Sequence, residues 1–225
     1  IIWSIIVALT KFNYNSFDLT TAASKGLGFN SSANGFETSS DGALTLIKTL
    51  TASSSSTLSF VDGSSSVVLD NTYPVYLFKF INLHPETNDR TVMYNFSTDS
   101  GSNYNVTKTN TYHYAFHHED NSDTDFDYYA LLDQAQATGD GYLSGGVGNG
   151  NDESVSGEMY LYNPSSTTFV KHYMIRVQQY YPGRNWESYA AGYCNTESAV
   201  DAVRFKFNTG NIDAGTIKLY GIKDS

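Results

Sequence analysis

Residues 73–83 read YPVYLFKFINL, and this stretch decides the fold class. Side chains of a β-strand alternate between the two faces of its sheet, so the stretch presents two different faces. One face carries Tyr76, Phe78, Phe80 and Asn82, and the other carries Val75, Leu77, Lys79 and Ile81. Because both faces are largely apolar, we expect a central strand that is covered on both sides.

Comparable strand patterns recur along the chain. They occupy residues 43–50, 57–61, 90–96, 103–107, 111–118, 155–162, 167–181, 188–194, 199–207 and 216–222. One segment, residues 128–138, has the character of a short helix, and the glycine-rich residues 139–151 are expected to be a flexible loop. Short strands at close intervals are typical of a sandwich or jelly roll rather than of a parallel α/β fold.

We therefore predict an all-β protein, an antiparallel β-sandwich with a jelly-roll-like arrangement over residues 43–225. Residues 1–42 are predicted to form an N-terminal extended strand and arm. Within them, residues 11–42 are expected to be irregular and polar, because Gly and Asn residues break any period.

Residues 1–10 read IIWSIIVALT and are the most hydrophobic stretch of the chain. They are too short for a membrane-spanning helix, which needs about 20 residues. They also lack the basic start and small-residue cleavage site of a signal peptide. In a strand, one face would carry Ile1, Trp3, Ile5, Val7 and Leu9.

Three interpretations of this apolar strand stay open. It completes the sheet of its own domain, or it is donated to a neighbouring subunit by β-strand addition. The third is that it reflects a reading frame whose start lies elsewhere, since the chain does not begin with Met. Under the second interpretation, the five residues of the apolar face form a subunit interface.

Charge and cysteine content exclude several classes of function. The chain carries 13 Lys and Arg against 23 Asp and Glu, a net charge of −10, and such a chain repels nucleic acid. The single cysteine, Cys194, excludes an intrachain disulfide and a zinc site of several thiolates. We expect Cys194 to be a small buried apolar residue.

Residues 117–127 form the best polar cluster. Oxygen ligands at Asp120, Asp123, Asp125 and Asp127 suit Ca²⁺, but the glycine and glutamate of an EF-hand loop are missing. A solvated acidic loop is the favoured interpretation. The adjacent His117 and His118 point to opposite faces of a strand and cannot chelate one metal ion. We therefore predict no metal and no cofactor.

No catalytic motif is apparent. The chain lacks a G-x-S-x-G elbow, and the glycine run at residues 145–152 is not followed by the Lys-Ser/Thr pair of a phosphate-binding loop. Glu158 is a conceivable member of a glycosidase carboxylate pair, but it has no identifiable partner. Trp186, Tyr180 and Tyr181 fit either a sugar-binding platform or the core. We predict that the protein is not an enzyme.

Several segments resemble virion structural proteins of tailed phages of marine and freshwater bacteria, cyanophages among them. They are residues 44–63, 75–85, 100–109, 163–173 and 199–221, and the resemblance spans most of residues 43–222. It implies a jelly-roll-like β domain in a capsid decoration or tail-associated role, without catalytic residues. Residues 1–7 are not part of the pattern.

The resemblance and the absence of a catalytic motif lead to one expectation and two alternatives. We expect a non-enzymatic structural subunit located in the virion. Its partners would be copies of itself and a major capsid or tail protein. The first alternative is an extracellular helical filament joined by the donated N-terminal strand, and the second is a carbohydrate-binding β domain.

Overall fold

The computed structural model describes residues 26–29, 36–39 and 43–224. The chain divides into two compact units, Ile1–Gly42 and Ala43–Ser225. In the first unit, β1 (Gly26–Phe29) pairs antiparallel with β2 (Phe36–Ser39). The sequence does not predict this hairpin, because two four-residue strands are too short to show a pattern among glycine and asparagine residues.

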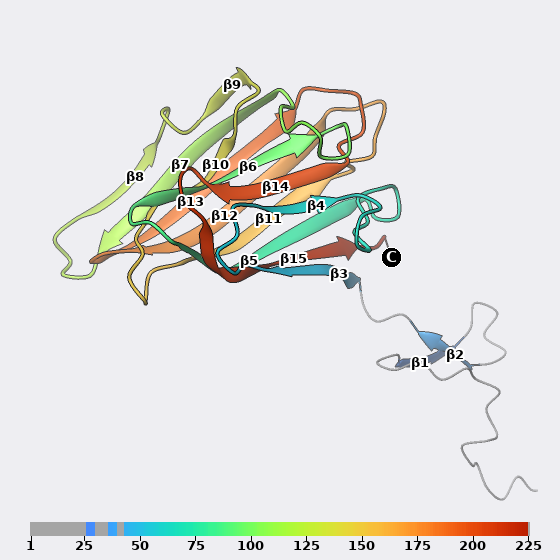
Figure 1. The fold of residues 1–225 in the computed structure, drawn as a ribbon, viewed down its shortest axis with the longest axis horizontal. Helices are drawn as coiled ribbons and strands as arrows, with labels where there is room; N and C mark the ends of the chain where they lie inside the picture. Colours follow the sequence, from blue (N-terminus) through green and yellow to red (C-terminus); the bar gives the residue numbers. More distant parts are fainter. Residues whose placement is uncertain (1–25, 30–35, 40–42, 225) are drawn as a thin grey trace, which may run out of the picture. The chain divides into compact units, whose positions relative to one another are not determined.

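The described part of the second unit contains strands and no helix (Figure 1). None of the described residues forms a helix long and apolar enough to span a membrane. The strands are β3 (Leu44–Thr51), β4 (Leu58–Val61), β5 (Val75–Pro85), β6 (Arg90–Ser97), β7 (Lys108–His118), β8 (Thr124–Tyr128), β9 (Gln134–Ala137), β10 (Gly141–Val147), β11 (Val155–Tyr162), β12 (Lys171–Tyr181), β13 (Arg184–Cys194), β14 (Ala202–Phe207) and β15 (Ile212–Ile222).

Eight of these strands form two antiparallel sheets with the order of a jelly roll. The smaller sheet has the order β10-β6-β14-β4, and the larger sheet begins β3-β15-β5-β11. Successive strands of this set lie in opposite sheets, except that β6 and β10 are neighbours in the smaller one. Two interlocked Greek keys produce this order. The predicted antiparallel β-sandwich is confirmed.

Two insertions widen the larger sheet beyond the jelly roll. The first, between β6 and β10, supplies β7, β8 and β9, and the second, between β11 and β14, supplies β12 and β13. Past β11 the sheet continues β12-β13-β7-β8, and β9 pairs with the other half of the outer edge of β7. The larger sheet therefore has nine strands against four in the smaller one.

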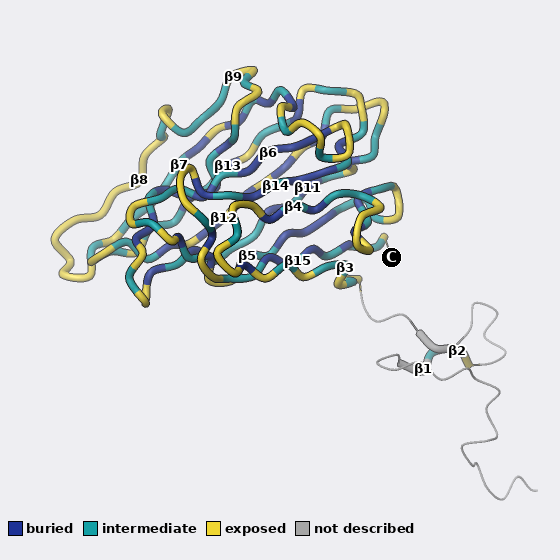
Figure 2. The backbone as a smooth tube through the Cα atoms, viewed as in Figure 1, coloured by how far each residue is buried: buried dark blue, intermediate teal, exposed yellow. Residues whose placement is uncertain are grey.

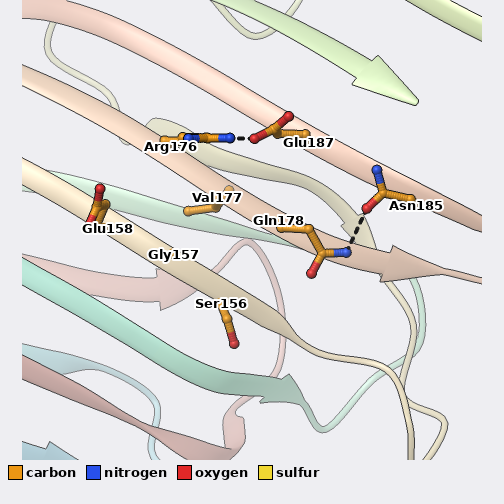
Figure 3. A pocket seen from close by; sticks show the side chains of 8 residues that line it. All are labelled: Ser156, Gly157, Glu158, Arg176, Val177, Gln178, Asn185 and Glu187. Carbon is orange, nitrogen blue, oxygen red and sulfur yellow. Dashed lines mark hydrogen bonds and ion pairs between the residues drawn. The ribbon is translucent and has the colours of Figure 1, made fainter. Parts of the chain in front are cut away.

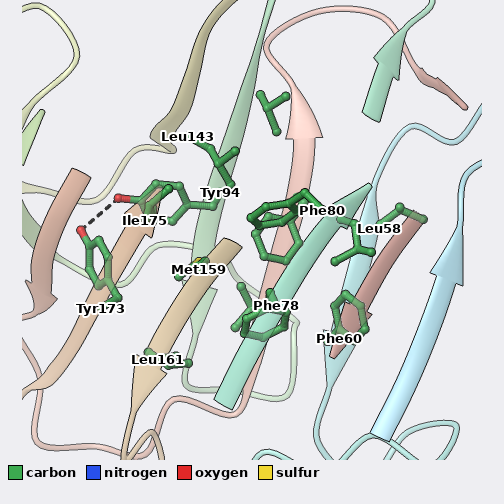
Figure 4. Close-up of a cluster of buried hydrophobic side chains, with 14 of the residues drawn as sticks. Leu58, Phe60, Phe78, Phe80, Tyr94, Leu143, Met159, Leu161, Tyr173 and Ile175 are labelled. Atoms are coloured by element: carbon green, nitrogen blue, oxygen red, sulfur yellow. Dashed lines mark hydrogen bonds between the residues drawn. The ribbon is translucent and has the colours of Figure 1, made fainter. Parts of the chain in front are cut away.

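The core lies between the two sheets and is rich in aromatic side chains (Figure 4). The ring of Phe205 on β14 meets those of Phe78 and Phe80 on β5 edge-on, with centroids 5.4 and 5.1 Å apart. Tyr94 on β6 donates a hydrogen bond to Tyr173 on β12 at 3.1 Å. Edge-on aromatic pairs add stability beyond the area that they bury. These contacts join the smaller sheet to the larger one.

Two sequence predictions about the segments on either side of β7 are wrong. Residues 128–138 contain no helix, since Tyr128 ends β8 and β9 follows at Gln134–Ala137. Tyr129 packs edge-on against Tyr114 with centroids 5.5 Å apart, and this tertiary contact overrides a weak helical pattern. The predicted strand at residues 103–107 is also absent, because β7 begins at Lys108.

The glycine-rich residues 139–151 are not a flexible loop throughout, because they contain β10. Leu143 and Val147 of this strand are fully buried. Gly141 lies so close to Tyr94 that an added Cβ atom would be 2.6 Å from the tyrosine ring. The glycines of this strand thus permit close packing against β6. From the sequence alone, glycines that serve close packing look the same as glycines of a flexible loop.

Candidate functional site

The five residues predicted from the sequence as a subunit interface, Ile1, Trp3, Ile5, Val7 and Leu9, lie outside the described residues. The described part of the chain offers two other surfaces with functional character. One is the face of the larger sheet that points away from the smaller sheet, here called the outer face. The other is the free edge of β3.

The outer face is defined by the alternation of β12 (Figure 2). Tyr173, Ile175 and Val177 are buried in the core, whereas every second residue between them is exposed. The exposed set includes Met174, whose exposed fraction is 54%. In a sandwich with one solvated face, outward positions are normally polar. An exposed thioether in the middle of a nine-stranded sheet therefore points to a ligand-binding surface.

A shallow groove of about 430 Å³ crosses the outer face over β11, β12 and β13 (Figure 3). Arg176 at its centre donates a 2.6 Å hydrogen bond from Nε to Glu187 Oε1. Gln178 donates to Asn185 Oδ1 at 3.0 Å. Glu158, on the other side of Arg176, lies 4.0 Å from the ammonium of Lys79. The groove thus offers charged and amide groups in a row along the sheet.

Aromatic rings continue the groove toward the other end of the strands. Tyr160 and Tyr162 on β11 are nearly parallel, with centroids 6.3 Å apart, and line a second depression together with Met174 and Tyr189. Tyr189 stacks on His113 of β7 at 5.0 Å, and the guanidinium of Arg176 lies 5.4 Å from its ring centroid. Flat rings beside hydrogen-bonding groups are a common way to bind ligands that have apolar and hydroxyl-bearing faces.

Glu158 is the one groove residue that the sequence singled out, and the structure places a second carboxylate in the same groove. Glu187 lines the same groove from β13. Glu158 is ion-paired with Lys79, and Glu187 is ion-paired with Arg176. The alternation of residues 184–194 could have placed Glu187 outward, but not in the same groove as Glu158, because strand order is not encoded in a local pattern.

Trp186 and Tyr181, considered from the sequence as a sugar platform, contribute to another cluster. Both rings pack against the guanidinium of Arg184, with centroids 4.8 and 4.7 Å from its central carbon. Trp186 also stacks on Tyr114 at 4.3 Å. Trp186 lies on the opposite face of β13 from Glu187 and is only partly exposed, so it does not line the groove.

The acidic segment lies in a turn and in β8. Asp120 caps the turn by accepting a hydrogen bond from the Ser122 backbone at 2.9 Å, and Asp125 accepts one from Phe126. Among the described residues, no group of three or more His, Cys, Asp or Glu side chains is arranged to hold a metal ion. Asp125 and Asp127 instead place charge on a short edge strand, which discourages pairing with other chains.

The edge of β3 lacks such protection. Among the described residues, β3 pairs with β15 on one side and with no strand on the other. Its single charged side chain, Lys48, is turned back to donate a 2.9 Å hydrogen bond to the Ser65 carbonyl of the same domain. Leu44 and Leu46 are 44% and 51% exposed. A long edge strand whose one charged side chain is engaged within its own domain is a template for another strand.

Comparison with protein-family models, curated protein sequences and solved structures found no match to this chain. The roles of the groove and of the β3 edge are therefore inferred from their own residues and geometry.

Proposed function

We propose that this protein is a non-enzymatic structural subunit of a phage virion, and that copies are joined by strand addition at β3. In this proposal, residues 1–9 of one copy pair with the edge of β3 in the next copy. The observation that carries it is the eight-residue edge of β3, which no strand of the described residues covers. The opposite edge of the larger sheet is closed by two short strands, β8 and β9.

The lengths and the chemistry of the two partners agree. Residues 1–9 carry a strand-like alternation of Ile, Trp, Val and Leu, and β3 exposes two leucines. Pairing would satisfy the backbone groups of the edge and cover both sets of apolar side chains. The jelly-roll order supports a virion role, since capsid proteins are among the proteins built on it. The sequence resemblance to phage virion proteins supports the same assignment.

Deleting residues 1–10 is expected to convert assemblies of the full chain into monomers, as measured by light scattering. Leu46→Lys should have the same effect, because lysine on an edge strand opposes pairing. Met174→Lys is the matched control, since Met174 is equally exposed but lies in mid-sheet, and it should leave assembly unchanged. A monomeric full chain, or assembly that persists in both edge variants, would contradict strand addition.

The virion assignment has a separate test. Gold-labelled antibody against residues 43–225 is expected to decorate intact phage particles in negative-stain micrographs. If labelling appears on free filaments, the subunit belongs to an extracellular filament instead. If neither object is labelled, the protein is not a component of either assembly.

A second candidate function, carbohydrate binding, is favoured by the groove of the outer face. Tyr160 and Tyr162 supply flat apolar surfaces, and Arg176 and Gln178 supply hydrogen-bonding groups beside them. This combination suits a pyranose ring, which has an apolar C–H face and a rim of hydroxyl groups. Lectin domains also occur on jelly rolls.

We expect the full chain to bind at least one oligosaccharide on a glycan array, with weaker binding by Tyr160→Ala. The loss should be at least about tenfold, or roughly 1.4 kcal/mol, because the ring faces the groove. Leu46→Lys serves as the control here and should bind normally. An array without hits, or equal binding by the tyrosine variant, would exclude the groove as a carbohydrate site.

A further inference from the structure

A buried polar centre joins β7 of the larger sheet to β6 of the smaller one, away from the groove. Lys108, at the start of β7 in the larger sheet, is fully buried, and Asn95 on β6 of the smaller sheet is 1% exposed. Burying an ammonium group is unfavourable unless its partners compensate for the lost water. Such a pair therefore needs either a complete set of hydrogen bonds or a chemical role.

The amine of Lys108 is held against the carboxamide of Asn95. Nζ lies 2.9 Å from Asn95 Oδ1, and it also contacts the carbonyl oxygens of Gly139 and Val106. Since a C=O bond is about 1.2 Å long, Nζ is no more than about 4 Å from the Cγ atom of Asn95. A near-attack geometry needs this distance to shorten to about 3–3.5 Å.

The carboxamide of Asn95 is fixed on both sides. Its Oδ1 accepts a 2.9 Å hydrogen bond from the backbone N–H of Phe96. Its Nδ2 donates to Asp140 Oδ1 at 3.1 Å and to the carbonyl oxygens of Tyr104 and Thr138. The N–H of Phe96 is therefore placed to stabilise negative charge on the oxygen, and the carboxylate touches the nitrogen.

Asp140 is a charged group in this centre. Arg204 and Lys206 each donate to it at 2.9 Å. Burial alone would raise the pKa of Asp140. Hydrogen bonds from Arg204, Lys206 and Asn95 outweigh burial and hold the pKa below its ordinary value. A carboxylate can accept a proton and pass it on.

Burial also makes the amine of Lys108 easier to deprotonate. It lowers the pKa of Lys108 to about 8, against smaller opposing effects of Cys194 and Asp140. Near pH 7, roughly a tenth of such an amine is neutral and nucleophilic.

We propose that Lys108 and Asn95 are joined by an intramolecular isopeptide bond that the folded chain forms by itself. Neutral Nζ attacks Cγ of Asn95, and Oδ1 takes the negative charge beside the N–H of Phe96. Asp140 accepts a proton from Nζ and passes it to Nδ2. The Cγ–Nδ2 bond then breaks, ammonia leaves, and an amide links Nζ to Cγ. The exchange of one amide for another needs no oxidant and no cofactor.

The bond would tie β7 of the larger sheet to β6 of the smaller one. It would also remove the buried ammonium, since an amide nitrogen carries no charge. A covalent link between the sheets suits a subunit that must survive outside a cell.

The intact mass of the purified full chain is expected to be lower than its sequence mass by about 17 Da, the mass of ammonia. Succinimide formation at asparagine also releases ammonia, so the link itself must be seen. Asp99 is the one acidic residue between Asn95 and Lys108. Proteolysis before Asp99 should therefore yield a branched peptide containing both residues.

Three variants test the assignment. Lys108→Arg should have its full sequence mass, and Asp140→Asn should retain the ammonia for lack of a proton carrier. Lys171→Met is the matched control, because Lys171 is also fully buried but bonds to the Thr196 carbonyl rather than to a carboxamide. It should keep the branched peptide.

Two results would overturn the proposal without any variant. They are a full sequence mass for the folded wild-type chain, and two separate peptides after cleavage before Asp99. A branched peptide in Asp140→Asn would remove the role given to Asp140.

Discussion

Replacing Phe205 with alanine is expected to lower the free energy of unfolding by about 3–5 kcal/mol. Phe205 is fully buried on β14, and its ring meets Phe60 on β4 as well as Phe78 and Phe80 on β5. Its removal leaves a cavity between the sheets that the surrounding rings can fill only in part. Chemical denaturation followed by tryptophan fluorescence measures the change.

Phe126→Ala is the matched control for this substitution. Phe126 lies on β8 and is 69% exposed, so its removal should change the free energy of unfolding by no more than about 0.5 kcal/mol. Equal losses in the two variants would mean that the cluster around Phe205 is not the core of the sandwich.

Raising the pH above about 10 is expected to destabilise the fold steeply. Burial raises the pKa of Cys194 to about 12, and it also raises the pKa values of Tyr94, Tyr112 and Tyr173 above the ordinary value of 10.0. In the unfolded chain these groups lose their protons first, so unfolding is favoured as the pH rises. Below the pKa of the unfolded chain, each group makes its full contribution to stability. As the pH rises from that value to the higher pKa of the folded chain, the contribution is lost.

Each such group contributes up to about 1.4 kcal/mol per pH unit. Lys171 acts in the opposite direction, because burial lowers its pKa and its ammonium disfavours folding. That penalty disappears as the pH rises toward the unfolded value near 10.4. Stability should therefore change little from about pH 8 to 10 and fall sharply beyond it. A thermal midpoint that stays constant up to about pH 11.5 would contradict the burial of these groups.

Local sequence patterns were sufficient for the strands whose two faces differ clearly. The predicted strand at residues 155–162 coincides with β11, and the predicted strand at residues 73–83 lies within two residues of β5. The patterns failed where local character and tertiary context disagree. Gln134–Ala137 forms β9 because it pairs with the edge of β7. Gly141–Val147 is a strand because glycine permits a close approach to Tyr94.

The surfaces with functional character were harder to predict, because each depends on strand order. Glu158 and Glu187 share a groove because β11, β12 and β13 are consecutive in the sheet. Lys108 on β7 and Asn95 on β6 meet although the two strands belong to different sheets, which no local pattern shows. The apolar residues 1–9 were visible in the sequence, but the edge of β3 that we propose as their partner was not.

Hydrogen exchange at β3 tests the central proposal most directly. Amides of Leu44–Thr51 should exchange at least about tenfold more slowly in assemblies of the full chain than in the variant lacking residues 1–10, because strand addition protects the edge. Amides of β8, on the other side of the sheet, should exchange equally in the two proteins. Assemblies in which β3 exchanges as fast as in the monomeric variant would show that subunits are joined elsewhere.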